Sequence, residues 1–205
     1  MNEPSNFRGN EATTEPFKIQ QNEGINQMTI NVDIPHYTTS KEALLHREEH
    51  TYYGHMITVP THEYLKEKGK RPFIISRSNS VGTGNFAGHW TGDNVASWEF
   101  LRSSINGNFL FQIYGMQMVG SDICGFNKDT TEELCSRWMQ LGAFYPFSRN
   151  HNVDTGRSQE PYAFGDTLLE TSRASLKTRY ALLKQLYSFM TAKKGKGSFF
   201  RPIAF

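Results

Sequence analysis

Apolar and polar positions along this chain predict short strands followed by amphipathic helices. The run Arg71–Ser76 is short and rich in β-branched and aromatic residues, which is typical of a buried parallel strand. Met116–Val119 predicts a second strand, and Tyr145–Phe147 predicts the start of a third. Apolar residues recur at steps of three and four from Leu169 to Met190, which predicts a long amphipathic helix that ends at Gly195.

Three further segments read as helices. Lys41–Leu65 predicts one helix, and Thr130–Phe144 predicts another, with Thr130 as its N-cap and Glu133 completing a capping box. The third is Ser97–Tyr114, and its apolar positions fall roughly on one face: Trp98, Leu101, Ile105 and Phe109.

Polar, proline-rich and glycine-rich stretches between these elements predict loops. Residues 1–40 contain three prolines and read as one long loop, and Asn79–Asn94 with its glycines reads as another. The order of elements is therefore β, α, β, α, which predicts an α/β fold with a parallel sheet. Polar and aromatic residues gather just after the strands, where a (β/α)8 barrel carries its active site. About three strands are visible and a closed barrel needs eight, so the pattern predicts half of a barrel.

Composition narrows the class of protein. With 205 residues and 37% hydrophobic residues, the chain can form one globular domain with a sizeable core. Its net charge of +2 gives no attraction toward nucleic acid or an anionic membrane. No apolar run approaches the length of a transmembrane helix, and the start of the chain lacks the basic and apolar regions of a signal peptide.

The segment Gly88–Asn94 carries the most distinctive chemistry. It reads Gly-His-Trp-Thr-Gly-Asp-Asn and places the indole of Trp90 three residues before the carboxyl of Asp93. A flat aromatic beside an acid suits a site that holds a sugar ring and protonates a glycosidic oxygen. A second carboxylate is needed for that chemistry, and Asp122, Arg149 and His151 follow the later strands.

Other motifs are weaker. The glycines at 82, 84 and 88 are out of step with a dinucleotide loop, and His46–His50 fits a zinc-protease pattern that a polar helix face produces by chance. We therefore expect neither a nucleotide nor a metal site. Cys124 and Cys135 are compatible with a disulfide or with two free thiols.

Several segments together resemble glycoside hydrolase family 31, on the branch of lysosomal and intestinal α-glucosidases. Met1–Phe7 is similar to the tail of the family's Trp-x-Asp-Met-Asn-Glu-Pro nucleophile motif, and Gly120–Phe126 is similar to the start of its second pattern. One departure is Ser121, where the family usually has a small apolar residue. The other matching segments are Pro72–Ser78, Gly88–Asn94, Leu134–Trp138 and Gly142–Asn152.

The resemblance implies a fold and a division of the chain. It implies that residues 1–205 are part of a family 31 catalytic barrel, namely its C-terminal half. Residues 1–40 would be the loop after the nucleophile strand, residues 41–197 the β/α units, and residues 198–205 the start of a following segment. The remainder of a full-length chain is then expected as a partner.

The resemblance also implies roles for individual residues. Asp93 would be the general acid/base, Trp90 and Phe126 aromatic walls of the sugar site, and Met1 a neighbour of the nucleophile. Hydrogen bonds to sugar hydroxyls would come from Arg77, Asp122 and His151. Cys124 and Cys135 would form a short disulfide, which favours a secretory, lysosomal or extracellular setting.

The implied reaction is retaining hydrolysis of terminal α-linked glucose from maltose-like oligosaccharides, with no metal or organic cofactor. The family's nucleophile is the aspartate directly before the Met of the first motif, and Met1 is the first residue here. We therefore expect this chain alone to be inactive. Two alternatives remain: a non-catalytic truncated product that binds carbohydrate weakly, and another family 31 activity such as α-xylosidase.

Overall fold

The computed structural model describes residues 2–3, 35–37, 43–45, 49–192 and 198. The chain divides into two units. The first comprises Met1–Pro72 and Ser76–Ser80, and the second comprises Phe73–Ile75 and Val81–Phe205. Several expectations fall outside the described residues: the role of Met1, most of the loop at 1–40, the helix end at Gly195 and most of the segment 198–205.

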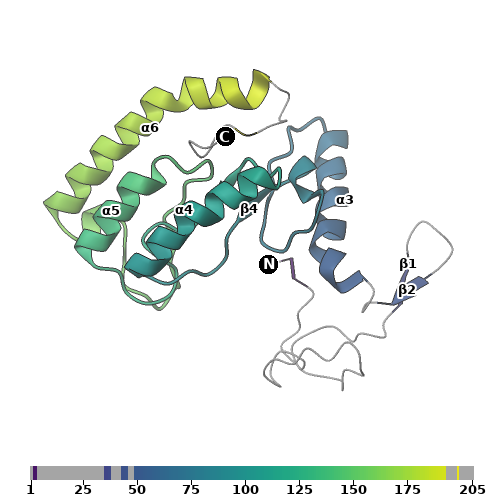
Figure 1. Ribbon diagram of the computed structural model, residues 1–205, viewed down its shortest axis with the longest axis horizontal. Helices are drawn as coiled ribbons and strands as arrows, with labels where there is room; N and C mark the ends of the chain where they lie inside the picture. The colour runs from purple at the N-terminus through teal and green to yellow at the C-terminus, as the bar shows by residue number, and fades with distance from the viewer. Residues whose placement is uncertain (1, 4–34, 38–42, 46–48, 193–197, 199–205) are drawn as a thin grey trace, which may run out of the picture. The chain divides into compact units, whose positions relative to one another are not determined.

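The first unit contains a short hairpin and a helix (Figure 1). Strand β1, Pro35–Tyr37, pairs antiparallel with β2, Ala43–Leu45. A 3-10 turn, η1 at His50–Tyr52, then leads into helix α3, Tyr53–Glu67. The prediction of one helix over 41–65 is therefore wrong at residues 43–45, and the predicted loop at 1–40 contains a strand. Ala43–Leu45 is made of good helix formers, but its pairing with β1 outweighs that weak preference.

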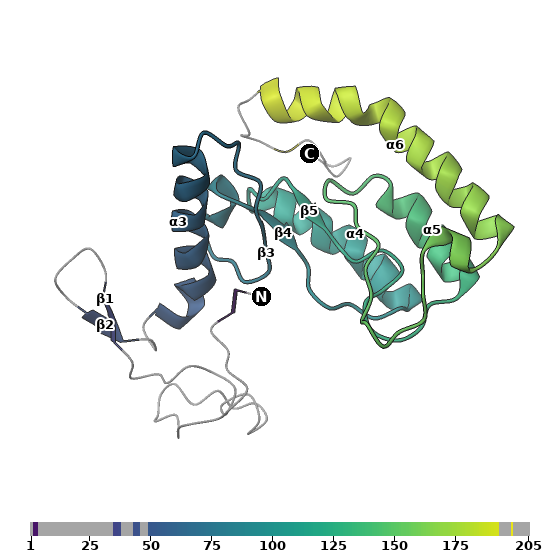
Figure 2. The same cartoon turned by 180° about the vertical axis from the view of Figure 1, so that it is seen from behind.

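The parallel sheet has the order β3-β4-β5 (Figure 2). Strand β3, Ile75–Ser76, lies where the two units meet along the chain, and β4, Gly88–Trp90, runs parallel to β5, Val119–Gly120. The strands predicted at 71–76 and 116–119 are thus present but shorter and shifted toward their C-terminal ends.

Strand β4 lies inside the segment predicted as a loop, so that prediction is wrong at residues 88–90. Gly88 suggested a turn, but its role is close packing. A Cβ atom at Gly88 would lie 2.4 Å from the carbonyl oxygen of Met118 on the adjoining segment. The Gly88 amide donates to the Ile74 carbonyl at 2.9 Å, which begins the pairing with the β3 side.

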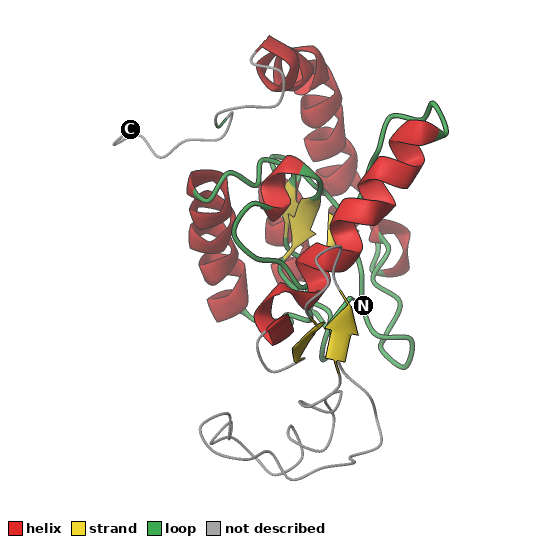
Figure 3. Cartoon of the chain, turned by 90° about the vertical axis from the view of Figure 1, so that its right-hand side faces the viewer, coloured by secondary structure: helices red, strands yellow, loops and turns green. Residues whose placement is uncertain are grey.

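Helices make up most of the regular structure of the second unit (Figure 3). They are α4, Trp98–Ile113; α5, Glu132–Gly142; and α6, Asp166–Ala192, with two 3-10 turns, η2 at Thr83–Asn85 and η3 at Pro161–Ala163. Among the described residues, no helix has both the length and the apolar character needed to cross a membrane.

Two details of the predicted helices are wrong. The N-cap of α5 is Thr131, whose hydroxyl accepts a hydrogen bond from the Leu134 amide at 3.3 Å, so Thr130 does not start the helix. Helix α4 buries Ser104, Asn108 and Gln112 most fully, while Trp98 of the expected apolar face is 49% exposed. The rest of that face is half-buried, and Leu101 packs against the core. A polar row at every fourth position faces inward on α4, a pattern that hydrophobic periodicity cannot reveal.

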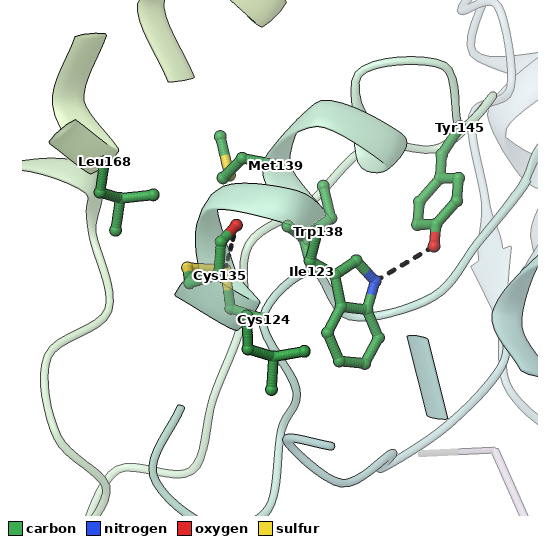
Figure 4. Packing of buried hydrophobic residues seen from close by; sticks show 8 residues of the cluster. Ile123, Cys124, Cys135, Trp138, Met139, Tyr145 and Leu168 are labelled. Carbon is green, nitrogen blue, oxygen red and sulfur yellow. Dashed lines mark hydrogen bonds between the residues drawn. A yellow bond between two sulfur atoms is a disulfide. The ribbon is translucent and has the colours of Figure 1, made fainter. Parts of the chain in front are cut away.

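The core of the second unit lies between the loop after β5, helix α5 and the start of α6 (Figure 4). Trp138 is fully buried, and its indole N–H donates to the Tyr145 hydroxyl at 3.1 Å. The Arg179 guanidinium of α6 donates to the carbonyls of Ala143 and Tyr145 at 2.8 and 2.6 Å. The buried cluster is Ile123, Cys124, Leu134, Cys135, Trp138, Met139, Tyr145 and Leu168.

The segment after α5 runs beside β5 without forming a regular strand, so the strand predicted from Tyr145 is wrong. The Phe147 amide donates to the Val119 carbonyl at 3.0 Å, and the Ile123 amide donates to the Arg149 carbonyl at 3.0 Å. Gly120 allows this close approach, because a Cβ atom there would lie 1.8 Å from the Phe147 carbonyl oxygen. The loop that carries Arg149 is thereby aligned with the end of β5.

Candidate functional site

The centre of the candidate site is a buried ion pair at the ends of β4 and β5. Asp122 is fully buried, and its Oδ1 accepts a hydrogen bond from Nη2 of Arg149 at 2.8 Å. The Arg149 guanidinium carbon lies 5.0 Å from the ring centre of Trp90 and 5.6 Å from that of Phe147. Two aromatic faces and one carboxylate therefore fix the orientation of this guanidinium.

Burial dominates the electrostatics of Asp122. Loss of hydration raises the pKa of this carboxyl above its ordinary value. The hydrogen bond and the positive charge of Arg149 oppose that rise in pKa. One oxygen of the carboxyl is thus held by Arg149 from a fixed direction.

A second pair of side chains lies next to this ion pair along the chain. The rings of Phe126 and His151 lie 5.0 Å apart between their centres, tilted by 36°. Phe126 follows β5 in the same loop as Asp122, and His151 follows Arg149. The Val153 amide donates to the Phe126 carbonyl at 3.1 Å, which keeps the two loops together.

Asp93 sits in an exposed loop directly after β4, beyond the turn at Gly92, where φ is 86°. Its neighbour Asn94 connects this loop to the next one. The Asn94 side chain donates to the Asp122 carbonyl at 2.9 Å and accepts from the Phe126 amide at 2.9 Å. The structure thus brings the Asp93 loop to the loop of Asp122 and Phe126 through Asn94.

Asp93 also lines a pocket of about 200 Å³ at the end of β4. The pocket is bounded on one side by α4 and on the other by the strand ends, and most of its lining side chains are small and polar. These lining residues are Thr91, Asp93, Asn94, Phe100, Ser103, Ser104, Gly107 and Ser121.

Ser121, the departure from the family pattern, has a partner in this structure. Its hydroxyl accepts a hydrogen bond from the Thr91 hydroxyl at 2.8 Å, and Ser121 itself is buried. The residue after β4 and the residue after β5 are therefore joined side chain to side chain. A polar residue fits at position 121 because the Thr91 hydroxyl gives the buried Ser121 hydroxyl a hydrogen bond.

The structure contains the disulfide that the family resemblance implies, between Cys124 and Cys135. Both cysteines are fully buried, and they link the loop after β5 to helix α5. Cys124 stands between Asp122 and Phe126 in the sequence, so the bond anchors the middle of the loop that carries both side chains.

Arg77 belongs to the first unit and is described within it. Its Nε lies 3.2 Å from a carboxylate oxygen of Glu3. Asn2 organises this region, because its side chain donates to the Ser78 carbonyl at 2.9 Å and accepts from the amides of Arg77 and Ser78 at 3.2 and 2.9 Å. Met1, the remaining candidate, lies outside the described residues.

Sequence reasoning noted Arg149 without assigning it a role, and it overlooked Asn94, Asn150 and Gln159. Arg149 could have been suspected because it is a basic residue two positions before His151 in the second family pattern. The others are ordinary amides whose contacts join distant segments, and no local pattern marks them. In the part of the chain that the structure describes, no group of three or more His, Cys, Asp or Glu side chains could hold a metal ion.

The comparison with protein families decides the family of this chain. The model of the glycosyl hydrolases family 31 TIM-barrel domain matches residues 1–189. The chain belongs to glycosyl hydrolase family 31. The site described above lies at the carboxyl ends of β4 and β5, where a barrel of this family presents its loops.

Several relatives of this family 31 chain are named alpha-glucosidases, and others are named sucrase-isomaltase. It is 45% identical to the lysosomal acid alpha-glucosidase of Tetrahymena pyriformis over 98% of this chain and 23% of that protein. It is 38% identical to human intestinal sucrase-isomaltase over 99% of this chain and 12% of that protein. The chain thus spans less than a quarter of the length of these relatives.

Solved structures of the family share the fold of this chain. A family 31 alpha-glucosidase from Bacteroides thetaiotaomicron superposes with a TM-score of 0.72 at 32% identity, over 84% of this chain and 30% of that one. A glucosidase II alpha subunit superposes with a TM-score of 0.71 at 32% identity, over 78% of this chain and 18% of that one. These likenesses support the α/β class expected from the sequence.

Proposed function

We propose that this chain supplies the acid/base side of a retaining α-glucosidase that releases terminal glucose from maltose-like substrates. The observation that carries the proposal is the position of Asp93. It is exposed in the loop after β4, and Asn94 ties that loop to the buried Asp122. A carboxyl open to solvent and fixed beside a sugar-binding loop can exchange protons with both substrate and water.

In the proposed reaction a second carboxylate attacks the anomeric carbon and forms a glycosyl-enzyme. Asp93 protonates the departing oxygen and afterwards removes a proton from the attacking water, so the product keeps the α configuration. We assign the nucleophile to the aspartate position that precedes Met1 in the family motif. No metal or organic cofactor takes part.

The remaining side chains would orient the sugar. Asp122 and His151 would hydrogen-bond hydroxyls, Arg77 would do the same, and Met1 would lie beside the nucleophile. Trp90 and Phe126 would form apolar walls, since sugar C–H faces pack against aromatic rings. Fixed placement of this kind lowers the entropic cost of bringing the reacting atoms into line.

We further propose that the chain is the C-terminal half of the barrel, expressed on the secretory route. The relatives named lysosomal support that setting, and so does the buried disulfide, because such bonds persist in oxidising compartments.

The test uses the full-length product of the gene with maltose and p-nitrophenyl α-glucoside as substrates. Asp93→Ala should reduce turnover of maltose by at least about 10²-fold, the contribution typical of a general acid/base. Asp154→Ala, at an exposed aspartate outside the site, is the matched control and should leave turnover unchanged.

Added azide then separates the acid/base from the nucleophile. With Asp93→Ala, azide should attack the anomeric carbon of the glycosyl-enzyme in place of water and release the nucleophilic carboxylate. The product would be α-glucosyl azide, identified by its anomeric NMR coupling. A β-glucosyl azide would instead assign Asp93 as the nucleophile and refute the proposed role. Faster cleavage of p-nitrophenyl α-xyloside than of p-nitrophenyl α-glucoside would point to an α-xylosidase.

A further inference from the structure

One buried glutamine connects the two loops that carry the candidate sugar contacts. Gln159 is 3% exposed, and its side-chain nitrogen lies within hydrogen-bond distance of four oxygen atoms. Two are the carbonyls of Ile123 and Gly125 in the loop after β5, at 3.3 and 3.2 Å. The other two are Oδ1 of Asn150 at 2.8 Å and the His151 carbonyl at 3.1 Å.

The contact with Asn150 is reciprocal. The Asn150 side-chain nitrogen donates to the backbone carbonyl of Gln159 at 2.9 Å, while the Asn150 side-chain oxygen accepts from the Gln159 side chain. Asn150 also forms an isolated parallel bridge with Ile123. Two hydrogen bonds therefore join Gln159 and Asn150 at the point where the two loops run side by side.

Only a side chain that donates hydrogen bonds suits position 159. Four acceptor oxygens surround one nitrogen, so the side chain there must donate, and an amide offers two N–H groups. An apolar side chain would leave these buried acceptors without their donor. A carboxylate would place a negative charge among partial negative charges in a dehydrated setting.

We propose that Gln159 is a positioning residue for the sugar site. It fixes the spacing of the loop with Asp122 and Phe126 relative to the loop with Arg149 and His151. Two measured contacts depend on that spacing: the ion pair at 2.8 Å and the ring pair at 5.0 Å. The role in substrate binding rests on the proposed function, while the effect on loop spacing does not.

The first experiment compares Gln159→Glu and Gln159→Leu in the full-length gene product. Both variants should raise KM for p-nitrophenyl α-glucoside and lower kcat/KM by about tenfold or more at neutral pH. The deficit of Gln159→Glu relative to wild type should shrink toward acid pH, because the protonated carboxyl again donates one hydrogen bond. The deficit of Gln159→Leu should stay constant with pH.

A matched control separates positioning from simple loss of folded protein. Gln112 is equally buried, at 3% exposed, but lies in α4 and bonds the Gln117 carbonyl. Gln112→Leu should lower the melting temperature without changing KM, since the molecules that remain folded have an intact site. Unchanged KM in both Gln159 variants would overturn the proposal, while loss of activity in Asp93→Ala would still support the proposed function.

A second measurement does not need activity. Because the two ring centres lie 5.0 Å apart, Phe126 should impose a ring-current shift on the His151 ring protons. NMR of the full-length gene product with labelled histidine should show that shift reduced in Gln159→Leu and retained in Gln112→Leu. If the wild-type gene product cleaves no α-glucoside, the proposed function fails and this measurement still decides the positioning role. An unaltered His151 shift in Gln159→Leu would overturn it.

Discussion

The Asp122 carboxyl is fully buried, and its hydrogen-bond partners determine how much free energy that burial costs. An isolated buried carboxylate costs several kcal/mol, and only specific donors offset the cost. Here the donor is Arg149, which is itself held over the ring of Trp90. The ion pair therefore matters more for the geometry of the site than for net stability.

Removing Arg149 should expose this dependence. Arg149→Met leaves Asp122 buried without its main partner, and we expect a loss of about 3 kcal/mol in the free energy of unfolding at pH 7. That is the low end for a broken buried pair, because the Arg149 side chain is 34% exposed. Thermal and urea unfolding measure it.

The sign of the pH dependence follows from the pKa of Asp122. Burial already raises this pKa in the folded state, and loss of Arg149 raises it further. The folded variant then binds more protons than the unfolded chain, so its stability increases as pH falls through the raised pKa. The stability gap to wild type should narrow from about pH 7 toward pH 4. A gap that is constant with pH, or Asp122→Asn failing to rescue Arg149→Met at pH 7, would contradict this explanation.

At the scale of elements, the sequence predicts the helices better than the strands. Helix α6 is recognisable because its apolar positions recur from Leu169 to Met190. Helix α4 begins after Ser97, a residue type that commonly caps helices. Strand β4 was missed because three residues give no periodicity and Gly88 suggests a turn. Thr130 and Thr131 are chemically equivalent as caps, so local sequence could not choose between them.

The candidate site, too, could be predicted only in part from the sequence. Trp90 and Asp122 could be expected at one edge, since each comes after a strand predicted from the sequence and the carboxyl ends of parallel strands share one edge. In the structure Trp90 is itself the last residue of β4. The burial of Asp122 and the stacking of Arg149 on Trp90 depend on how loops fold over that edge. The contacts of Gln159 reach up to 36 positions along the chain, which no motif encodes.

The disulfide is the strongest local constraint on the loop after β5. It joins residues 11 positions apart, and chain-entropy reasoning assigns such a closure about 3 kcal/mol of stability. Cys124→Ala with Cys135→Ala should lower the free energy of unfolding by about that amount, as measured in urea under oxidising conditions.

Reduction of the wild-type protein is the matching control for the disulfide prediction. Wild type with added reductant should approach the stability of the double variant, while the double variant should not respond to reductant. Equal stability of wild type and double variant without reductant would contradict the prediction.

At the scale of the whole molecule, the long helix α6 presents apolar side chains to solvent. Tyr180 is 70% exposed, Tyr187 57% and Leu183 38%, at helical spacings of three and four. An apolar row of this kind is unusual on a free surface and is normally covered by other protein. The chain spans 23% of the length of the Tetrahymena relative.

We expect the 205-residue chain on its own to self-associate through this row. Leu183→Lys combined with Tyr187→Lys should shift the sedimentation profile toward monomer and reduce binding of an apolar fluorescent dye. Lys184→Glu, at an exposed polar position of the same helix, should change neither. Monomeric behaviour of the unmodified chain at tens of micromolar would contradict this expectation.

The linkage between Cys124 and Cys135 has a consequence for the order of events during synthesis. Translation produces both cysteines before it reaches Asn150 and Gln159, so an oxidising lumen can close the bond in a nascent chain. The loop with Asp122 and Phe126 is then already restrained when the later segment arrives to dock on it. Chains made in a reducing cytosol must assemble the same loops without the disulfide in place. The choice of expression host therefore affects the yield of correctly folded protein.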